Sequence, residues 1–123
     1  MKQKKTGFRR LGGAIENSVA GLRSALRSET AFRQECALTL ILVPLGFWLG
    51  QSAVQRALLI GTCLLVLVIE LVNTSIEAAV DRTGTDFDIL AGRAKDLGSA
   101  AVFVSILLTL LVWGLIAWER FGQ

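Results

Sequence analysis

The sequence ELVNTSIEAAVD, Glu70–Asp81, follows thirteen uncharged and mostly apolar residues, so it predicts the second half of a membrane-spanning helix. At about 100° per residue, four polar side chains fall within about 60° of one another: Glu70, Asn73, Glu77 and Asp81. We call these four residues the acidic stripe. Because ionisable groups at membrane depth usually face a polar interior, the stripe favours a site that handles a cation or a proton. The alternative is a set of structural hydrogen bonds between helices.

Composition supports a membrane protein. The chain has 123 residues, of which 53% are hydrophobic, and its mean hydropathy is +0.58. This is the length of one domain, but the composition is too apolar for a small soluble one. The absence of histidine from the sequence excludes imidazole catalysis and most zinc sites. Cys36 and Cys63 lack CxxC spacing and are expected to be free and buried.

Residues 7–29 are predicted to form an amphipathic helix that lies on the membrane surface. Its apolar residues recur at helical steps of three and four: Phe8, Leu11, Ile15, Val19, Leu22 and Leu26. The arginines between them would point toward phosphate headgroups. Gly12, Gly13 and Gly21 are expected to weaken this helix locally.

Three membrane spans are predicted, at residues 36–55, 57–80 and 97–118, giving a single all-α polytopic domain. A polar elbow at 28–35 leads into the first span, and a short connection with Arg56 follows it. Asp81–Asp96 is expected to be a loop, with Gly84 and Gly92 as turn residues. Small residues at 98–101 would let the third span approach the second closely.

The distribution of positive charge predicts the orientation of the chain in the membrane. Eleven of the thirteen Lys and Arg residues lie before Cys36 or in the second loop, which places the amino terminus and that loop in the cytoplasm. The basic amino-terminal region beside apolar spans favours an anionic membrane surface as a partner, and no nucleic acid is expected as a partner.

Three spans and one surface helix cannot wall off the acidic stripe from lipid, so we expect the stripe to be buried against neighbouring subunits.

The charged residues on the cytoplasmic side have the chemistry that phosphoryl transfer requires. Carboxylates suit Mg²⁺, and basic groups beside them would neutralise phosphate charge. Glu70 lies about 10 Å deeper than Glu77, where loss of water makes a carboxylate a stronger proton acceptor. No GxxxxGK[ST] motif occurs. From the residues alone, a kinase and a small transporter that uses Glu70 as a proton or cation carrier are comparably plausible.

Three motifs resemble the small integral-membrane diacylglycerol kinase family of bacteria: ELVNTSIEAAVDR at 70–82, GRAKDLGSAA at 92–101 and AFRQE at 31–35. The resemblance implies a homotrimer in the bacterial inner membrane, with active sites between subunits at the cytoplasmic face. It also implies transfer of the ATP γ-phosphate to the hydroxyl of diacylglycerol, with Mg²⁺ as cofactor. Related bacterial proteins phosphorylate undecaprenol, and an undecaprenol kinase stays the alternative within the family.

The resemblance also implies residue roles. Glu70 would be the general base, with Asn73 beside it on the stripe, and Glu29 and Glu77 would hold the metal. The expected ATP-binding residues are Arg10, Glu29, Glu77, Asp86, Phe87, Asp88, Lys95 and Asp96. The expected lipid-binding residues are Arg10, Arg23, Ala31, Phe32, Arg33, Gln34, Glu35, Trp48, Arg56, Glu70 and Ser99.

Overall fold

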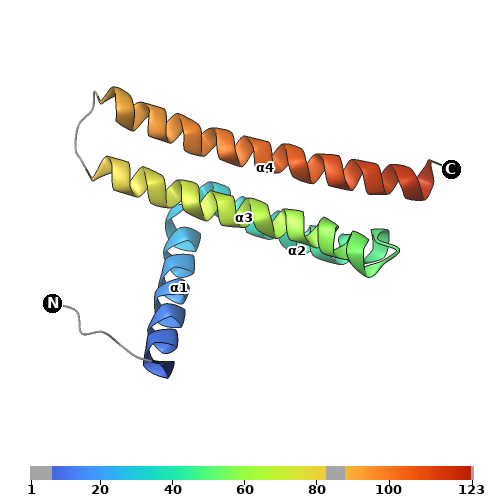
Figure 1. Cartoon of the computed structure of the whole chain (residues 1–123), viewed down its shortest axis with the longest axis horizontal. Helices are drawn as coiled ribbons and strands as arrows, with labels where there is room; N and C mark the ends of the chain where they lie inside the picture. Colours follow the sequence, from blue (N-terminus) through green and yellow to red (C-terminus); the bar gives the residue numbers. More distant parts are fainter. Residues whose placement is uncertain (1–6, 83–87, 123) are drawn as a thin grey trace.

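The structure, a computed structural model, describes residues 7–82 and 88–122 and consists of four helices (Figure 1). In chain order these are α1 (Phe8–Ser28), α2 (Thr30–Leu49), α3 (Ala53–Asp81) and α4 (Ile89–Phe121). Helices α2, α3 and α4 run alongside one another, whereas α1 projects across their common direction. The all-α prediction is confirmed for the described residues.

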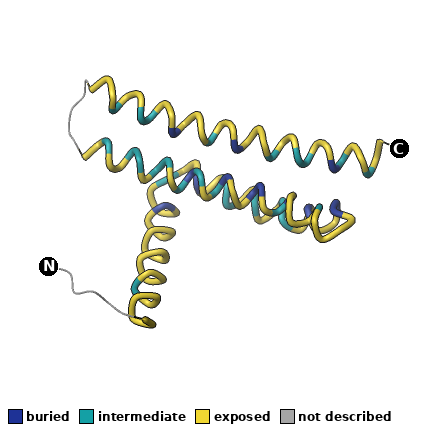
Figure 2. Tube along the Cα trace, in the orientation of Figure 1, coloured by how far each residue is buried: buried dark blue, intermediate teal, exposed yellow. Residues whose placement is uncertain are grey.

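Helices α2, α3 and α4 are each long and apolar enough to cross a membrane. Helix α3 packs on both of its neighbours, which contact each other little. The residues buried within the bundle lie mainly along the facing sides, and the outer sides are exposed (Figure 2). Many exposed residues are large and apolar, so these surfaces require lipid or other protein as their surroundings. The prediction of a multi-pass membrane protein is therefore confirmed.

Helix α1 matches the predicted range 7–29 closely. It continues through Gly12, Gly13 and Gly21 without interruption, so the glycines do not break it. All six residues of its predicted apolar face are exposed, and Ala25 is its one buried residue.

Two predicted polar connections are shorter than expected. The elbow at 28–35 is wrong in extent, because Glu29 alone separates α1 from α2 and residues 30–35 are helical. The loop at 81–96 is also too long, because Asp88 Oδ1 accepts a hydrogen bond from Leu90 N (2.9 Å) and caps α4 there. Gly92 is consequently helical, while Gly84 lies outside the described residues. Charged residues at these places extend the helices beyond the apolar stretch and do not end them.

Side chains join the three helices at the end of the bundle where α2 is followed by α3. Ser52 Oγ accepts from Gln55 N (3.1 Å) and caps α3, so the predicted connection at Arg56 is part of that helix. Leu49, Leu59 and Ile116 form the buried core there. Side chains that donate to backbone carbonyls join the helices: Trp113 Nε1 to Leu59 O (3.0 Å), Arg120 Nη1 to Trp48 O (2.5 Å) and Leu49 O (2.9 Å), and Arg56 Nε to Phe47 O (3.0 Å). The Arg120 guanidinium also lies 4.7 Å from the centre of the Trp48 ring.

Candidate active site

The acidic stripe lies along α3 with a gradient of burial. Glu70 is 8% exposed, Asn73 and Glu77 are half-buried, and Asp81 at the end of the helix is exposed. Asn73 Nδ2 donates a hydrogen bond to Glu77 Oε1 at 3.3 Å. The stripe therefore leads from the interior of the bundle to its end, as the helical spacing predicts.

Helix α4 passes directly over Asn73. Gly98 is buried, and a Cβ atom added there would collide with Asn73 Oδ1. This contact confirms the predicted close approach of the third span to the second at Gly98. Ser99, Ala100 and Ala101 are exposed and do not take part in the contact.

Three buried oxygens near the stripe have no hydrogen-bond partner within the part of the chain that the structure describes: Glu35 Oε2, Glu70 Oε2 and Asn73 Oδ1. Buried polar groups are nearly always paired in folded proteins, so unpaired acceptors call for a specific explanation. All three are acceptors, which makes a ligand with a hydroxyl group, a proton or a cation the chemically matching partner.

Four carboxylates are linked electrostatically through Glu70, and we call them the carboxylate cluster: Glu29, Glu35, Glu70 and Glu77. Glu70 interacts electrostatically with each of the other three. The four side chains come from three elements, since Glu29 forms the elbow, Glu35 lies on α2, and Glu70 and Glu77 lie on α3. The sequence motifs contain Glu35, Glu70 and Glu77, and the family resemblance implies Glu29 as well. The motifs do not predict that Glu35 interacts with Glu70.

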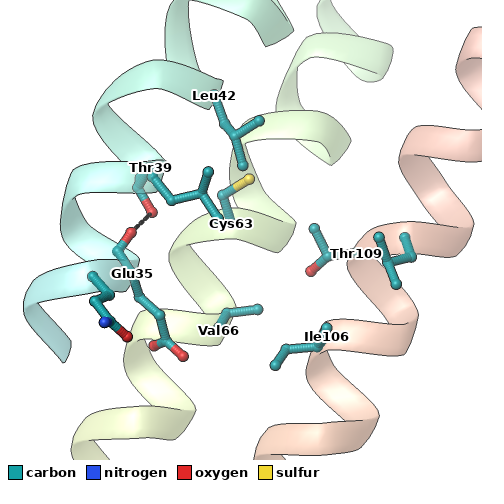
Figure 3. A pocket seen from close by; sticks show the side chains of 10 residues that line it. Glu35, Thr39, Leu42, Cys63, Val66, Ile106 and Thr109 are labelled. Atoms are coloured by element: carbon teal, nitrogen blue, oxygen red, sulfur yellow. Dashed lines mark hydrogen bonds between the residues drawn. The ribbon is translucent and has the colours of Figure 1, made fainter. Parts of the chain in front are cut away.

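A cavity of about 370 Å³ opens between α2, α3 and α4 next to the cluster (Figure 3). The Glu35 side chain extends from α2 toward α3 beside Val66, and Ile106 and Thr109 face it from α4. Its lining is mostly apolar, with Glu35 as the one charged group. The cavity is suited to an apolar chain with a polar end. No sequence motif predicted it, because its walls come from distant apolar residues without a distinguishing pattern.

The expected nucleotide-binding residues lie largely at the exposed end of the stripe. Lys95 on α4 forms an ion pair with Asp81 on α3, with 2.6 Å between Nζ and Oδ1. Asp96 is exposed beside Lys95, and Asp88 caps the same helix. Asp86 and Phe87 lie outside the described residues. The sequence motifs contain Asp81 and Lys95 but did not predict that they pair.

A family model described as "Prokaryotic diacylglycerol kinase" matches residues 16–117. The chain belongs to this family. A diacylglycerol kinase from Escherichia coli (strain K12) is 43% identical over 122 residues, which cover 99% of this chain and 100% of that protein. A diacylglycerol kinase from Haemophilus influenzae is 47% identical over 111 residues, covering 90% of this chain and 94% of the relative. A third, from Pseudomonas aeruginosa, is 44% identical over 111 residues, with 90% coverage of both chains.

Membership of the prokaryotic diacylglycerol kinase family calls for a metal site, and the carboxylates present fit one kind. Within residues 7–82 and 88–122, no three acidic or cysteine side chains come close enough to hold a metal by themselves. Mg²⁺ commonly takes one or two protein carboxylates and completes its shell with substrate phosphates. Glu29 and Glu77, which both interact with Glu70, are a ligand set of that type.

The remaining site residues expected of a prokaryotic diacylglycerol kinase are spread widely in one chain. Ala31, Phe32, Arg33 and Gln34 lie on the first turns of α2 near the cluster, where Phe32 is buried and Gln34 lines the cavity. Ser99 is exposed on α4, and Arg23 is exposed on α1 about 9 Å along the helix from Glu29.

Three others are not brought to the cluster. Arg10 lies about 28 Å along α1 from Glu29. Trp48 and Arg56 lie at the opposite end of the bundle, with Arg56 about 30 Å along α3 from Glu77.

Proposed function

We propose that this chain is a diacylglycerol kinase that uses ATP and Mg²⁺ and produces phosphatidic acid. The observation that carries the proposal is Glu70, a buried carboxylate with a free oxygen on the helix face that also presents Glu77. It lies about 10 Å further into the bundle than Glu77. An offset of this size matches the difference in depth between a phosphate at headgroup level and a lipid hydroxyl below it. Diacylglycerol has no charged headgroup, so its hydroxyl can reach that depth.

In this mechanism Glu70 acts as the general base. Its carboxylate accepts the hydroxyl proton while the lipid oxygen forms a bond to the γ-phosphorus of ATP. The bond from that phosphorus to the bridging oxygen breaks, and the bond electrons leave with ADP. Asn73 lies one turn along α3 and bonds to Glu77, so it would orient the base and the transferring phosphate.

The metal and the nucleotide would be bound by the exposed half of the site. Glu29 and Glu77 would hold Mg²⁺, which neutralises charge on the phosphates when bound. Lys95 and Asp96 would contact ATP from the first turns of α4, together with Arg10 and the segment 86–88. The Lys95–Asp81 pair supports this arrangement because it fixes the ammonium group beside the stripe.

The lipid would lie between α2, α3 and α4, with its hydroxyl at Glu70. Glu35 and Gln34 border the apolar cavity there, which supports their proposed contact with lipid. Arg23, Ala31, Phe32 and Ser99 complete the proposed lipid contacts on this side. Trp48 and Arg56 would meet lipid at the opposite membrane surface, since they lie at the other end of α2 and α3.

We further propose a homotrimer in the bacterial inner membrane, with the amino terminus and the segment between α3 and α4 in the cytoplasm. Helix α1 would lie on the cytoplasmic surface with its exposed apolar residues in the membrane. Arg10 is too far along α1 to reach the cluster of its own chain, which supports a site completed by a neighbouring subunit.

The test is a phosphoryl-transfer assay with a panel of lipid alcohols. The purified chain in mixed micelles receives radiolabelled ATP and either diacylglycerol or undecaprenol, with and without Mg²⁺. We expect label in phosphatidic acid only when Mg²⁺ is present. Label in undecaprenyl phosphate alone would contradict the proposed substrate. Proton or cation flux in liposomes without any phosphoryl transfer would instead support the transporter.

A further inference from the structure

The elbow between α1 and α2 consists of one residue, Glu29, with extended backbone angles of φ −112° and ψ 105°. Its N–H donates to Ala25 O (2.9 Å), and its carbonyl accepts from Arg33 N (3.1 Å). The Glu29 backbone therefore closes one helix and opens the next. Its side chain makes no capping hydrogen bond to α2. The backbone of Glu29 is fully used by the elbow, and the carboxylate is left for another partner.

Arg33, one turn into α2, spans this elbow with its side chain. Nη1 donates to the carbonyl oxygens of Leu26 and Arg27, both at 2.9 Å. Nη2 donates to Thr30 Oγ1 at 3.2 Å. The last carbonyls of a helix lack partners within the helix and carry the negative end of its dipole, so a guanidinium is a suitable cap. A side chain of α2 thus fastens the end of α1.

The elbow that this clamp spans determines how Glu29 lies relative to α3. Glu29 and Glu77 both interact electrostatically with Glu70, so all three carboxylates lie within the range of such an interaction. A movement of Glu29 away from α3 would separate it from the other two. The elbow is a single extended residue, so a small change in its two backbone angles would be sufficient. A guanidinium bonded to both helices resists that movement.

We propose that Arg33 is a positioning residue, whose guanidinium fixes the angle between α1 and α2 and so holds the Glu29 carboxylate toward the acidic stripe of α3. This proposal rests on the proposed function, in which Glu29 and Glu77 hold Mg²⁺. It gives Arg33 a role different from the lipid contact expected from the sequence. The donors of Nη1 are already directed at two backbone carbonyls.

The test compares Arg33→Ala with Arg27→Ala. The control removes the neighbouring exposed cation of α1, whose side chain has no part in the elbow bonds. Nitroxide labels at Asn17→Cys on α1 and Ala79→Cys on α3 measure the placement of α1 by pulsed EPR in bilayers. Cys36 and Cys63 are first replaced by alanine, and labelled chains are diluted with unlabelled ones. Mn²⁺ binding in the presence of a non-hydrolysable ATP analogue measures cation affinity without turnover.

We expect Arg33→Ala to broaden the distance distribution and to weaken Mn²⁺ binding by about tenfold to a hundredfold, as the loss of a group that orients a metal ligand typically does. Arg27→Ala should change neither. An Arg33→Ala variant with the parent's distances and Mn²⁺ affinity but a raised KM for diacylglycerol would overturn the proposal in favour of a lipid contact. A parent chain that binds no Mn²⁺ would contradict the proposed function, and the distances alone would then decide the role of Arg33.

Discussion

Glu70 is the one buried carboxylate among the residues that the structure describes, and one of its oxygens has no partner. Burial of an unpaired carboxylate destabilises a fold, because the charged form loses its hydration. A residue of this kind is retained where its chemistry is needed. Its less buried neighbours on the stripe have partners: Asn73 Nδ2 donates to Glu77 Oε1, and Asp81 pairs with Lys95. The arrangement separates a buried carboxylate from polar and charged groups nearer the end of the helix.

Glu70→Gln should bind ATP almost normally and turn over about 10² to 10⁴ times more slowly, because glutamine keeps the shape but cannot accept the proton. Removing a buried charge should leave the free energy of unfolding unchanged or slightly raised. Single-turnover transfer from radiolabelled ATP to diacylglycerol measures the rate. Glu119→Gln, which removes an exposed carboxylate at the other end of the bundle, is the control and should be fully active. A Glu70→Gln rate within a few-fold of the parent would make Glu70 a structural residue.

Glu29→Gln and Glu77→Gln should each raise the Mg²⁺ concentration needed for half-maximal activity by more than about tenfold, since each loses a charged ligand. Turnover should also fall, because charge on the transferring phosphate is less well neutralised. Titrating free Mg²⁺ at saturating ATP measures both effects. Glu16→Gln removes an exposed carboxylate of α1 and should behave as the parent. Unchanged Mg²⁺ dependence in both site variants would rule out these two ligands.

At the scale of helices, the contact between α3 and α4 at Asn73 and Gly98 determines the shape of the site. The absence of a side chain at Gly98 lets α4 lie against the Asn73 amide. Two carbonyl-directed bonds, from Trp113 and Thr109 to the backbone of α3, hold the same pair of helices further along. The position of Asn73 therefore depends on α4 as well as on its own helix.

Gly98→Ala should lower turnover, because the added methyl group would displace the Asn73 amide and disturb its bond to Glu77. Overpacking of this kind typically costs about 1 to 3 kcal/mol of stability. Gly114→Ala is the matched control on the same helix, since an added Cβ there meets no atom of the described chain. Alanine is the better helix former, so the control should be as stable as the parent or more so, by up to about 1 kcal/mol. Unfolding titrations and initial rates compare the two. Equal stability and equal initial rates of the two variants would contradict the importance of the contact between Asn73 and Gly98.

The helices were predictable from the sequence, and their ends were not. Apolar runs determine which segments can lie in a membrane, and three such runs gave three of the four helices. Polar residues at 30–35 and 89–96 looked like connections, yet they continue α2 and α4, because a helix can extend beyond the apolar layer. The residues that mark the starts of α3 and α4 are single N-cap residues, Ser52 and Asp88. Interactions across helices, such as the electrostatic one between Glu35 and Glu70, depend on packing that no local pattern encodes.

At the scale of the whole molecule, the single chain leaves most of its large apolar side chains exposed. Lipid can cover the outer sides of α2 and α4, but the charged cluster needs polar or protein surroundings. Arg10, which we propose to contact ATP, lies about 28 Å along α1 from Glu29, so the proposed site would be incomplete in one chain. Both features favour a closed assembly of several copies.

Cross-linking in native-like bilayers should give products that stop at three chains. The physical reason is that a closed ring buries the carboxylate cluster of every subunit in the same way. Mass measurement of the cross-linked species tests the number. Incorporation of one chain per nanodisc provides the comparison and should give an inactive enzyme. Full activity of such single chains would contradict a shared site.

The link from Arg120 to the end of α2 has a consequence for the biogenesis of the protein. Arg120 lies on α4, yet it bonds to Leu49 O and covers the Trp48 ring at the turn before α3. The ribosome makes α4 after both helices that this residue fastens. While α4 is being synthesised, the hairpin of α2 and α3 has the bond from Arg56 Nε to Phe47 O, but the Leu49 carbonyl still lacks its donor from Arg120. Insertion of α4 therefore completes the hydrogen bonds at the end of the first hairpin as well as adding a helix.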